Sequence, residues 1–172
     1  MSYALVVIDY QVDFVSGSLG SDAAVAIEPK IIRKIEDCLQ RGGKLFFTMD
    51  THDPGYLDTD EGRRIPIIHC EKDSPGWQLY GKVADYAKYG TMITKSTFGS
   101  LGIPGLLAGF NEIELCGVAT NVCVITNAVL IKTAHPESKV YVEPEAVASY
   151  DKELHLKALD VMASFGIDVI GR

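Results

Sequence analysis

The chain has 172 residues and a mass of 18.7 kDa, a length that predicts one compact domain covering residues 1–172. Apolar residues make up 47% and charged residues 23% of the chain, a composition typical of globular proteins that excludes disordered and fibrous classes. Acidic residues outnumber basic ones by 23 to 16 and no basic stripe offsets the net charge of −7, so neither a nucleic acid nor an anionic membrane is an expected partner.

Apolar runs typical of strands alternate with amphipathic stretches typical of helices. In chain order, we predict a strand at 3–8, a helix at 22–41, a strand at 44–49, a long loop at 50–80, a strand at 91–94, a short helix within 100–110, a strand at 113–118, a buried helix at 121–133, a strand at 139–142, a helix at 152–165 and a strand at 167–170. Under the right-handed crossover rule, this order predicts a three-layer α/β/α fold. Its centre is an open, mostly parallel, six-stranded Rossmann-like sheet with helices on both faces.

The cysteines and the apolar runs indicate the cellular compartment in which the protein is expected to act. The four cysteines form no CxxC pair, and the first residues lack a cationic export signal. The longest uncharged stretch, 115–131, has 17 residues and several polar side chains, too short and too polar to span a bilayer. We therefore expect a cytoplasmic protein without a membrane partner, in which an unpaired cysteine can serve as a reactive thiol.

Chemically active side chains follow the predicted strands at their carboxyl ends. Asp9 follows the first strand, Asp50 and His52 follow the second, and Lys95 follows the third. A turn of small residues leads from the fourth strand to Cys123. Because ligands bind outside the carboxyl ends of an open parallel sheet, these side chains are expected to meet in one site.

Cys123 is the candidate nucleophile, since it lies in the first turn of a predicted helix. There the helix dipole and the free backbone N–H groups favour a thiolate and can receive an oxyanion. Asp9 is the candidate base for the thiol proton, and Lys95 balances the charges. The alternative is a small buried side chain at Cys123, a strand-end cap at Asp9 and a solvated strand end at Lys95.

A second constellation, formed by Asp50, His52 and His69, predicts a metal site. Imidazole nitrogens and carboxylate oxygens are ligands of Zn²⁺, Mn²⁺ and Fe²⁺, and the D-x-H spacing puts both side chains on one face of an extended segment. The further carboxylate is open among three neighbours: Asp58, Asp60 and Glu61.

Five segments resemble the isochorismatase-like cysteine hydrolase superfamily, and within it the nicotinamidases. They occur in the order of that family and span most of the chain: VVIDYQVDF at 6–14, FTMDTHDP at 47–54, IHC at 68–70, ITKSTF at 93–98 and GVATNVCV at 117–124. This ordered set of segments is highly specific for the superfamily and only moderately specific for the substrate.

The resemblance implies roles for individual residues. Asp9, Lys95 and Cys123 match the catalytic triad of the family. The Val118–Ala119 bond matches a non-proline cis peptide, which would turn the Ala119 N–H toward the oxyanion site beside the N–H of Cys123.

The resemblance also implies the ligands of the metal and the walls of the pocket. The implied metal ligands are Asp50, His52, His69 and, by its spacing, Glu61. The implied substrate-binding residues are Phe14, Phe98 and Val118, although both aromatic side chains could equally be ordinary core residues. Many nicotinamidases stack an aromatic side chain on the substrate ring at the position of Pro66, so Trp77 or Tyr80 is the candidate replacement.

The expected activity is hydrolysis of a small amide, first of all nicotinamide to nicotinate and ammonia, as in NAD salvage. It would pass through a thioester on Cys123, with a divalent metal, zinc as first candidate, positioning the substrate. The first alternative is a related hydrolase of another small amide, a carbamoyl compound or isochorismate. A non-enzymatic flavodoxin-like binding domain is a remote one. A homo-oligomer is compatible with the apolar helix at 121–133.

Overall fold

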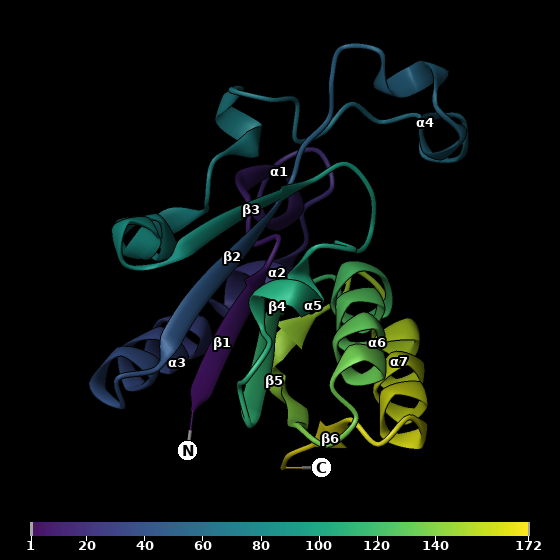
Figure 1. Cartoon of the computed structure of the whole chain (residues 1–172). Helices are drawn as coiled ribbons and strands as arrows, with labels where there is room; N and C mark the ends of the chain where they lie inside the picture. The colour runs from purple at the N-terminus through teal and green to yellow at the C-terminus, as the bar shows by residue number, and fades with distance from the viewer. Residues whose placement is uncertain (1, 172) are drawn as a thin grey trace.

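The computed structural model describes residues 2–171 and is built on one six-stranded sheet (Figure 1). All strand pairs are parallel, in the order β3-β2-β1-β4-β5-β6. The strands are β1 (Tyr3–Ile8), β2 (Lys44–Asp50), β3 (Thr91–Lys95), β4 (Glu112–Val118), β5 (Lys139–Ala148) and β6 (Asp168–Val169). The predicted six-stranded parallel sheet is confirmed.

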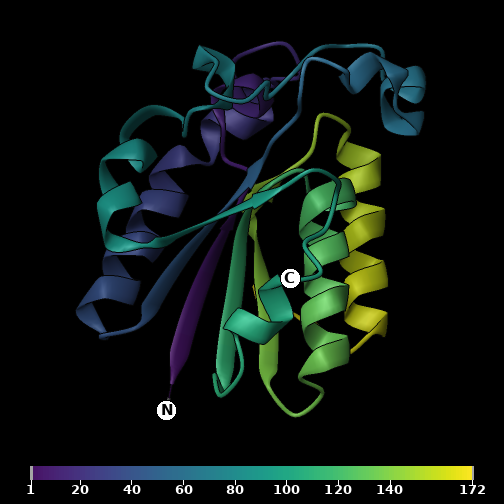
Figure 2. The ribbon, with the colours of Figure 1, turned by 45° about the horizontal axis from the view of Figure 1, so that its top comes forward.

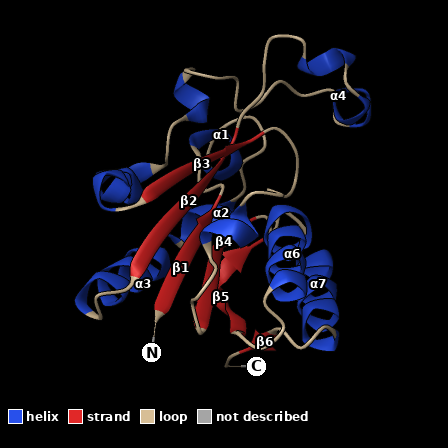
Figure 3. Ribbon diagram, in the orientation of Figure 1, coloured by secondary structure: helices blue, strands red, loops and turns tan. Residues whose placement is uncertain are grey.

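Helices cover both faces of this sheet (Figures 1 and 3). On one face lie α2 (Asp22–Ala26), α3 (Glu28–Gln40) and the 3-10 helix η3 (Gly81–Tyr89). On the other lie α5 (Ile103–Leu106), α6 (Ile125–Ala134) and α7 (Lys152–Ser164). Alternate side chains of β1 enter the two cores, and every residue of this strand is buried, as its continuous apolar run predicts.

Two predicted elements differ markedly from the structure. The helix predicted at 22–41 is two helices, α2 and α3, because Pro29 in the first turn of α3 has no N–H to continue the hydrogen-bond ladder of α2. The strand predicted at 139–142 continues to Ala148 as β5, past the polar Glu-Pro-Glu sequence at 143–145 that interrupts its apolar run. The second difference changes which residues reach the carboxyl edge of the sheet.

The long segment 50–80 crosses the carboxyl ends of the strands (Figure 2). It contains only short elements: η1 (Tyr56–Asp58), α4 (Asp60–Arg64) and η2 (Pro75–Trp77). Beneath it the chain leaves β1 at Asp9, whose φ of +43° is rare for a residue with a side chain, and enters the short helix α1 (Val12–Val15). This end of the molecule therefore has a sheet edge below and a covering loop above.

Within residues 2–171, no helix combines the length and the hydropathy that crossing a bilayer requires.

Candidate active site

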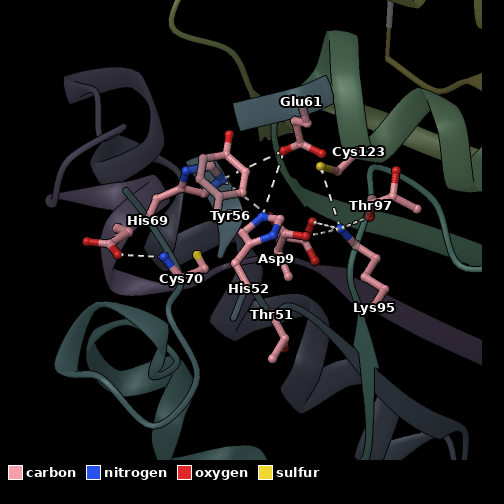
Figure 4. A network of polar contacts seen from close by, with 12 residues as sticks. Asp9, Thr51, His52, Tyr56, Glu61, His69, Cys70, Lys95, Thr97 and Cys123 are labelled. Atoms are coloured by element: carbon pink, nitrogen blue, oxygen red, sulfur yellow. Dashed lines mark hydrogen bonds and ion pairs between the residues drawn. The ribbon is translucent and has the colours of Figure 1, made fainter. Parts of the chain in front are cut away.

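Asp9, Lys95 and Cys123 meet at the carboxyl edge of the sheet (Figure 4). The Lys95 Nζ lies 2.6 Å from Asp9 Oδ2 and 3.8 Å from Cys123 Sγ. All three residues are buried: Asp9 is 0%, Lys95 7% and Cys123 5% exposed. An acid, an ammonium and a thiol are thus held together away from bulk water, where electrostatic interactions are strong.

The carboxylate of Asp9 is oriented by the neighbouring strand β2. Its Oδ1 accepts a hydrogen bond of 2.6 Å from the Thr48 hydroxyl, and the Asp9 N–H donates to the same hydroxyl oxygen at 3.0 Å. Among residues 2–171, Asp9 Oδ2 is the one buried side-chain nitrogen or oxygen that no donor meets in hydrogen-bond geometry, although the Lys95 ammonium is close to it. An acceptor beside Cys123 is therefore available for a proton.

Cys123 lies in a tight turn that joins β4 to α6. The helix predicted at 121–133 begins with the π-helical turn η4 (Thr120–Val124) before α6 starts at Ile125. N–H groups in a first turn have no partner within the helix. The Val118–Ala119 peptide bond just before η4 is cis, as the resemblance implied.

A glycine lets β4 approach β1 just before this turn. Gly117 has a φ of +113°, and a Cβ built there would lie 2.1 Å from the carbonyl oxygen of Ile8. Only glycine fits this backbone conformation and this contact. The close approach brings the start of the Cys123 turn next to the end of β1, where Asp9 follows.

Burial dominates the ionisation of the nucleophile. Burial raises the pKa of the Cys123 thiol well above its usual range, and the charge of Asp9 raises it further, while Lys95 opposes both effects. Burial likewise raises the pKa of Asp9, again against the effect of Lys95. Burial and the charge of Asp9 thus favour the thiol and act against the thiolate that the helix dipole was expected to favour.

Lys95 keeps its proton as well. Burial acts to lower the pKa of its ammonium, but the charges of Asp9, Cys123 and Asp50 outweigh burial and raise it. The ammonium also donates to the Thr97 carbonyl oxygen at 2.9 Å. Lys95 is therefore a fixed positive charge beside the thiol rather than a proton carrier.

A cluster of four further ligand atoms lies beside this group. One atom from each residue lies within 4.8 Å of the other three, in the set Asp50, His52, Glu61 and His69. Asp50 Oδ2 is 2.9 Å from His52 Nε2 and 3.5 Å from His69 Nε2. Two imidazole nitrogens and two carboxylate oxygens that converge in this way fit a divalent ion such as zinc.

The backbone prepares His69 for such a role. Its Nδ1 lies 2.7 Å from the carbonyl oxygen of Ile67, which can only accept a hydrogen bond, so Nδ1 carries the proton. The other nitrogen, Nε2, then faces the cluster and is the atom that would bind a metal ion. A second hydrogen bond of this kind commonly orients metal-binding histidines.

The structure places one of the three candidate acidic neighbours in the cluster. Glu61 Oε1 lies 3.8 Å from His52 Nε2 and 4.0 Å from His69 Nε2. Asp60 instead pairs with Arg64 at the surface, and Asp58 is exposed. The hydroxyl of Thr59 caps α4 by accepting from the Gly62 N–H at 2.9 Å, which sets the rotation that turns Glu61 inward.

Asp50 joins the two groups into one site. Its Oδ1 lies 3.3 Å from Lys95 Nζ, while Oδ2 faces the histidines. Burial acts to raise the pKa of Asp50, but hydrogen bonds from His52 and His69 and the charge of Lys95 outweigh it and lower that pKa. The shared carboxylate is therefore ionised at neutral pH.

A cavity of about 390 Å³ opens onto both groups. Its walls include all three predicted substrate-binding residues, Phe14, Phe98 and Val118, together with Ala119 and Cys123. Carboxylate and imidazole groups from Asp50, Glu61 and His69 lie on the same walls. A small, largely apolar molecule in this cavity would touch the thiol and the ligand cluster at once.

Neither proposed replacement for the missing aromatic at Pro66 lines the cavity. Trp77 donates its indole N–H to Thr51 Oγ1 at 2.8 Å, and the ring of Tyr80 packs edge-on against Tyr10. The prediction that one of them stacks on a substrate ring is therefore wrong, because both side chains belong to contacts outside the cavity.

The cavity has walls that the sequence reasoning missed. They include Leu19, Ile65, Ser149 and Tyr150, of which Tyr150 is 67% exposed at the rim. Ser149 and Tyr150 directly follow the last residue of β5. The search for residues after each strand would have found them, had the end of β5 been placed at Ala148 instead of Val142.

Comparisons with known proteins agree with this geometry. The model of the isochorismatase domain family matches residues 3–172. A curated relative, the uncharacterized isochorismatase family protein PncA of Bacillus subtilis strain 168, is 30% identical over 178 residues, covering 95% of this chain and 96% of the relative.

Two solved structures illustrate the similarity in three dimensions. The zinc complex of the pyrazinamidase of Pyrococcus horikoshii has a TM-score of 0.87 and 27% identity, with 99% of each chain covered. The pyrazinamidase/nicotinamidase of Streptococcus mutans has a TM-score of 0.85 and 30% identity, covering 98% of this chain and 100% of that one. With a family model that matches nearly its whole length and a fold shared with these enzymes, the chain belongs to the isochorismatase family.

Proposed function

We propose that the chain is an amidohydrolase that converts nicotinamide into nicotinate and ammonia, a step of NAD salvage in the cytoplasm. One observation carries the proposal: a buried Asp9–Lys95–Cys123 group and a four-ligand cluster share Asp50 and face one cavity. The pyrazinamidase and nicotinamidase structures that the chain resembles support the choice of an aromatic amide.

The first half of the reaction forms a thioester. Asp9 Oδ2 takes the proton of Cys123 as the sulfur attacks the amide carbonyl carbon, and the backbone N–H groups of Ala119 and Cys123 receive the developing oxyanion. The C–N bond then breaks. Asp9 returns the proton to the departing nitrogen, and ammonia leaves.

The second half releases the acid. Asp9 takes a proton from a water molecule, whose oxygen attacks the thioester carbonyl. The C–S bond breaks, nicotinate is released, and the proton on Asp9 restores the Cys123 thiol. Lys95 remains an ammonium throughout and stabilises both the Asp9 carboxylate and the transient thiolate.

The ligand cluster fits a divalent metal ion, held by Asp50, His52, Glu61 and His69. When bound, such an ion would supply a Lewis acid that accepts an electron pair from a group such as a pyridine nitrogen. Three of the four ligands lie on the cavity wall together with the apolar rings of Phe14 and Phe98, so this chain would orient a flat heterocycle with its amide toward Cys123.

The test is ammonia release from nicotinamide, pyrazinamide and aliphatic amides by the wild type and by Cys123→Ala. We expect the ring amides to be preferred and the variant to lose at least about 10³-fold in rate with its folding intact. Cys38→Ala, which changes a buried cysteine in α3 outside the site, is the matched control and should keep its activity. Near-normal turnover by Cys123→Ala would show that the nucleophile is misassigned.

A second candidate function is hydrolysis of another small substrate, such as a carbamoyl compound or isochorismate. It is favoured by Pro66, which gives the cavity no stacking ring at the position where many nicotinamidases have one. A substrate panel separates the two functions, with pyruvate measured for isochorismate because that substrate releases no ammonia.

A further inference from the structure

Asn127 is a buried amide in the first turn of α6, a helix that otherwise packs apolar side chains against the sheet. The residue is 0% exposed. A buried amide is costly unless its hydrogen-bonding groups are paired, so its partners indicate what it is for.

All three partners of this amide are backbone groups of the active-site walls. Oδ1 accepts from the Ser100 N–H at 2.9 Å, and Nδ2 donates to the carbonyl oxygens of Phe98 at 3.2 Å and of Cys123 at 2.8 Å. One side chain thus connects the turn that carries the nucleophile to the loop that carries Phe98.

That loop, residues 96–102, has no regular structure of its own to hold it. It leaves β3 after Lys95 and presents Phe98, 39% exposed, to the cavity. Gly99 lies so close to α6 that a Cβ there would be 2.7 Å from the Thr126 side chain and 2.8 Å from that of Leu130. The loop therefore lies directly on α6, where the bonds of Asn127 can fix it.

We propose that Asn127 is a positioning residue that fixes the Phe98 wall relative to Cys123 and thereby sets the affinity for the ring of the substrate. The proposal rests on the proposed function, since it concerns how the same cavity binds an aromatic amide. Asn127 itself does not line the cavity and acts through Phe98.

Asn127→Thr should keep the hydrogen bond to the turn of Cys123 but remove the two hydrogen bonds to the loop that carries Phe98. On α6, Thr126 and Thr133 already donate their hydroxyls to the carbonyl oxygens four residues earlier, Val122 and Val129, both at 2.7 Å. A threonine at 127 can bond the Cys123 carbonyl oxygen in the same way, but it is too short to reach the loop. Asn127→Ala removes all three bonds and serves as the second variant.

The measurements are KM and kcat for nicotinamide in the wild type, in both variants, and in each of these combined with Phe98→Ala. We expect Asn127→Thr to raise KM by about 10-fold or more with kcat within about threefold, as for a misplaced binding wall. In the Phe98→Ala background the same change should alter KM by less than about twofold, because the wall is already absent.

Alkylation of Cys123 by chloroacetamide, a reagent with no ring, reports on the nucleophile alone. Its rate should stay within about twofold in Asn127→Thr. Val129→Ala, which shortens a side chain that packs into the core from the same helix, controls for general destabilisation and should leave KM unchanged.

Three results would be decisive against particular claims. If the wild type releases no ammonia from nicotinamide, the proposed function fails. If the wild type is active but Asn127→Thr keeps the wild-type KM, the positioning role fails alone. If alkylation slows as much as turnover, or the effect on KM persists in Phe98→Ala, Asn127 acts on the nucleophile and the proposal is overturned.

Discussion

Asp50 presents its two carboxylate oxygens to different neighbours, one to Lys95 and one to the two histidines. A neutral amide in its place supplies only one oxygen and no charge. We expect Asp50→Asn to weaken Zn²⁺ binding by at least about 10–100-fold, measured by titration against a competing chelator. Asp53→Asn, at an exposed position three residues away, should bind Zn²⁺ as the wild type does; equal loss in both variants would contradict the assignment.

Replacing Asp9 is expected to change two measured rates in opposite directions, the alkylation of Cys123 and the release of ammonia. The charge of Asp9 raises the pKa of the Cys123 thiol, and Lys95 lowers it. Removing that charge in Asp9→Asn should therefore lower the thiol pKa and shift the pH profile of chloroacetamide alkylation to lower pH, so that the rate at pH 7 rises. Ammonia release should fall by about 10²-fold or more because the base is lost.

The two measurements share one sample, so misfolding cannot imitate the result. Thr51→Ala is the comparison variant, because the Thr51 hydroxyl bonds the Met49 carbonyl oxygen and the Trp77 indole instead of Asp9. Slower alkylation in Asp9→Asn would mean that Asp9 activates the thiol at rest instead of raising its pKa.

At the end of β2, the side chain of Gln11 takes the place of a missing strand neighbour. β1 ends at Ile8 and the backbone turns away at Asp9, yet β2 continues to Asp50. The amide of Gln11 accepts from the Asp50 N–H at 2.8 Å and donates to the Asp50 carbonyl oxygen at 2.9 Å, the two bonds that a strand neighbour would make. Gln11 thus extends the sheet by one residue, up to the shared carboxylate.

Gln11→Leu should reveal this role. Leaving the buried backbone groups of Asp50 unpaired should lower the free energy of unfolding by about 1–3 kcal/mol, measured by urea denaturation. Zn²⁺ affinity should fall with it, because Asp50 is then less well positioned. Gln40→Leu, at the exposed end of α3, should change neither quantity; stability and Zn²⁺ affinity like those of the wild type in Gln11→Leu would argue against the pairing.

The apolar runs of the strands determine which residues of the site can be predicted from the sequence. Strands such as β1 and β2, which are buried on both faces, appear in the sequence as apolar runs, so the residues at their carboxyl ends can be predicted. The sequence Glu143-Pro144-Glu145 interrupts the apolar run of β5, so the predicted strand ends at Val142. The cavity wall at Tyr150, which follows the true end of β5, is therefore not predicted. The residue types alone, without the resemblance, do not separate Glu61 from Asp58 and Asp60, because the local conformation of η1 and α4 decides which of the three side chains points inward.

The role proposed for Asn127 cannot be predicted from the sequence. An amide among apolar residues has no periodicity of its own, and two of its three partners, the Ser100 N–H and the Phe98 carbonyl oxygen, lie in a loop 27 and 29 residues earlier in the chain. Only the packing of that loop on α6 reveals what the amide does.

The ligand cluster connects the covering segment 50–80 to the sheet. Asp50 belongs to β2, Glu61 to α4 and His69 to the chain beyond it, and without an ion the two carboxylates repel each other. An ion that binds only the folded state stabilises it by mass action. We expect excess Zn²⁺ to raise Tm by several degrees over the EDTA-treated protein, for about 2–3 kcal/mol of binding free energy.

His52→Ala provides the comparison for this effect. Scanning calorimetry should show a much smaller Zn²⁺-dependent rise for this variant, since one of four ligands is missing. An equal rise in both proteins would place the stabilising ion elsewhere.

The order of the strands has a consequence for how such a chain can diversify. Asp9 and Cys123 follow β1 and β4, the two central strands, whereas Lys95 ends β3, the strand at the rim of the sheet. Insertions or deletions after Lys95 would remodel the wall at Phe98 without disturbing the centre of the sheet. Substrate range can thus drift over evolutionary time through one peripheral loop while the bond-breaking apparatus is inherited unchanged.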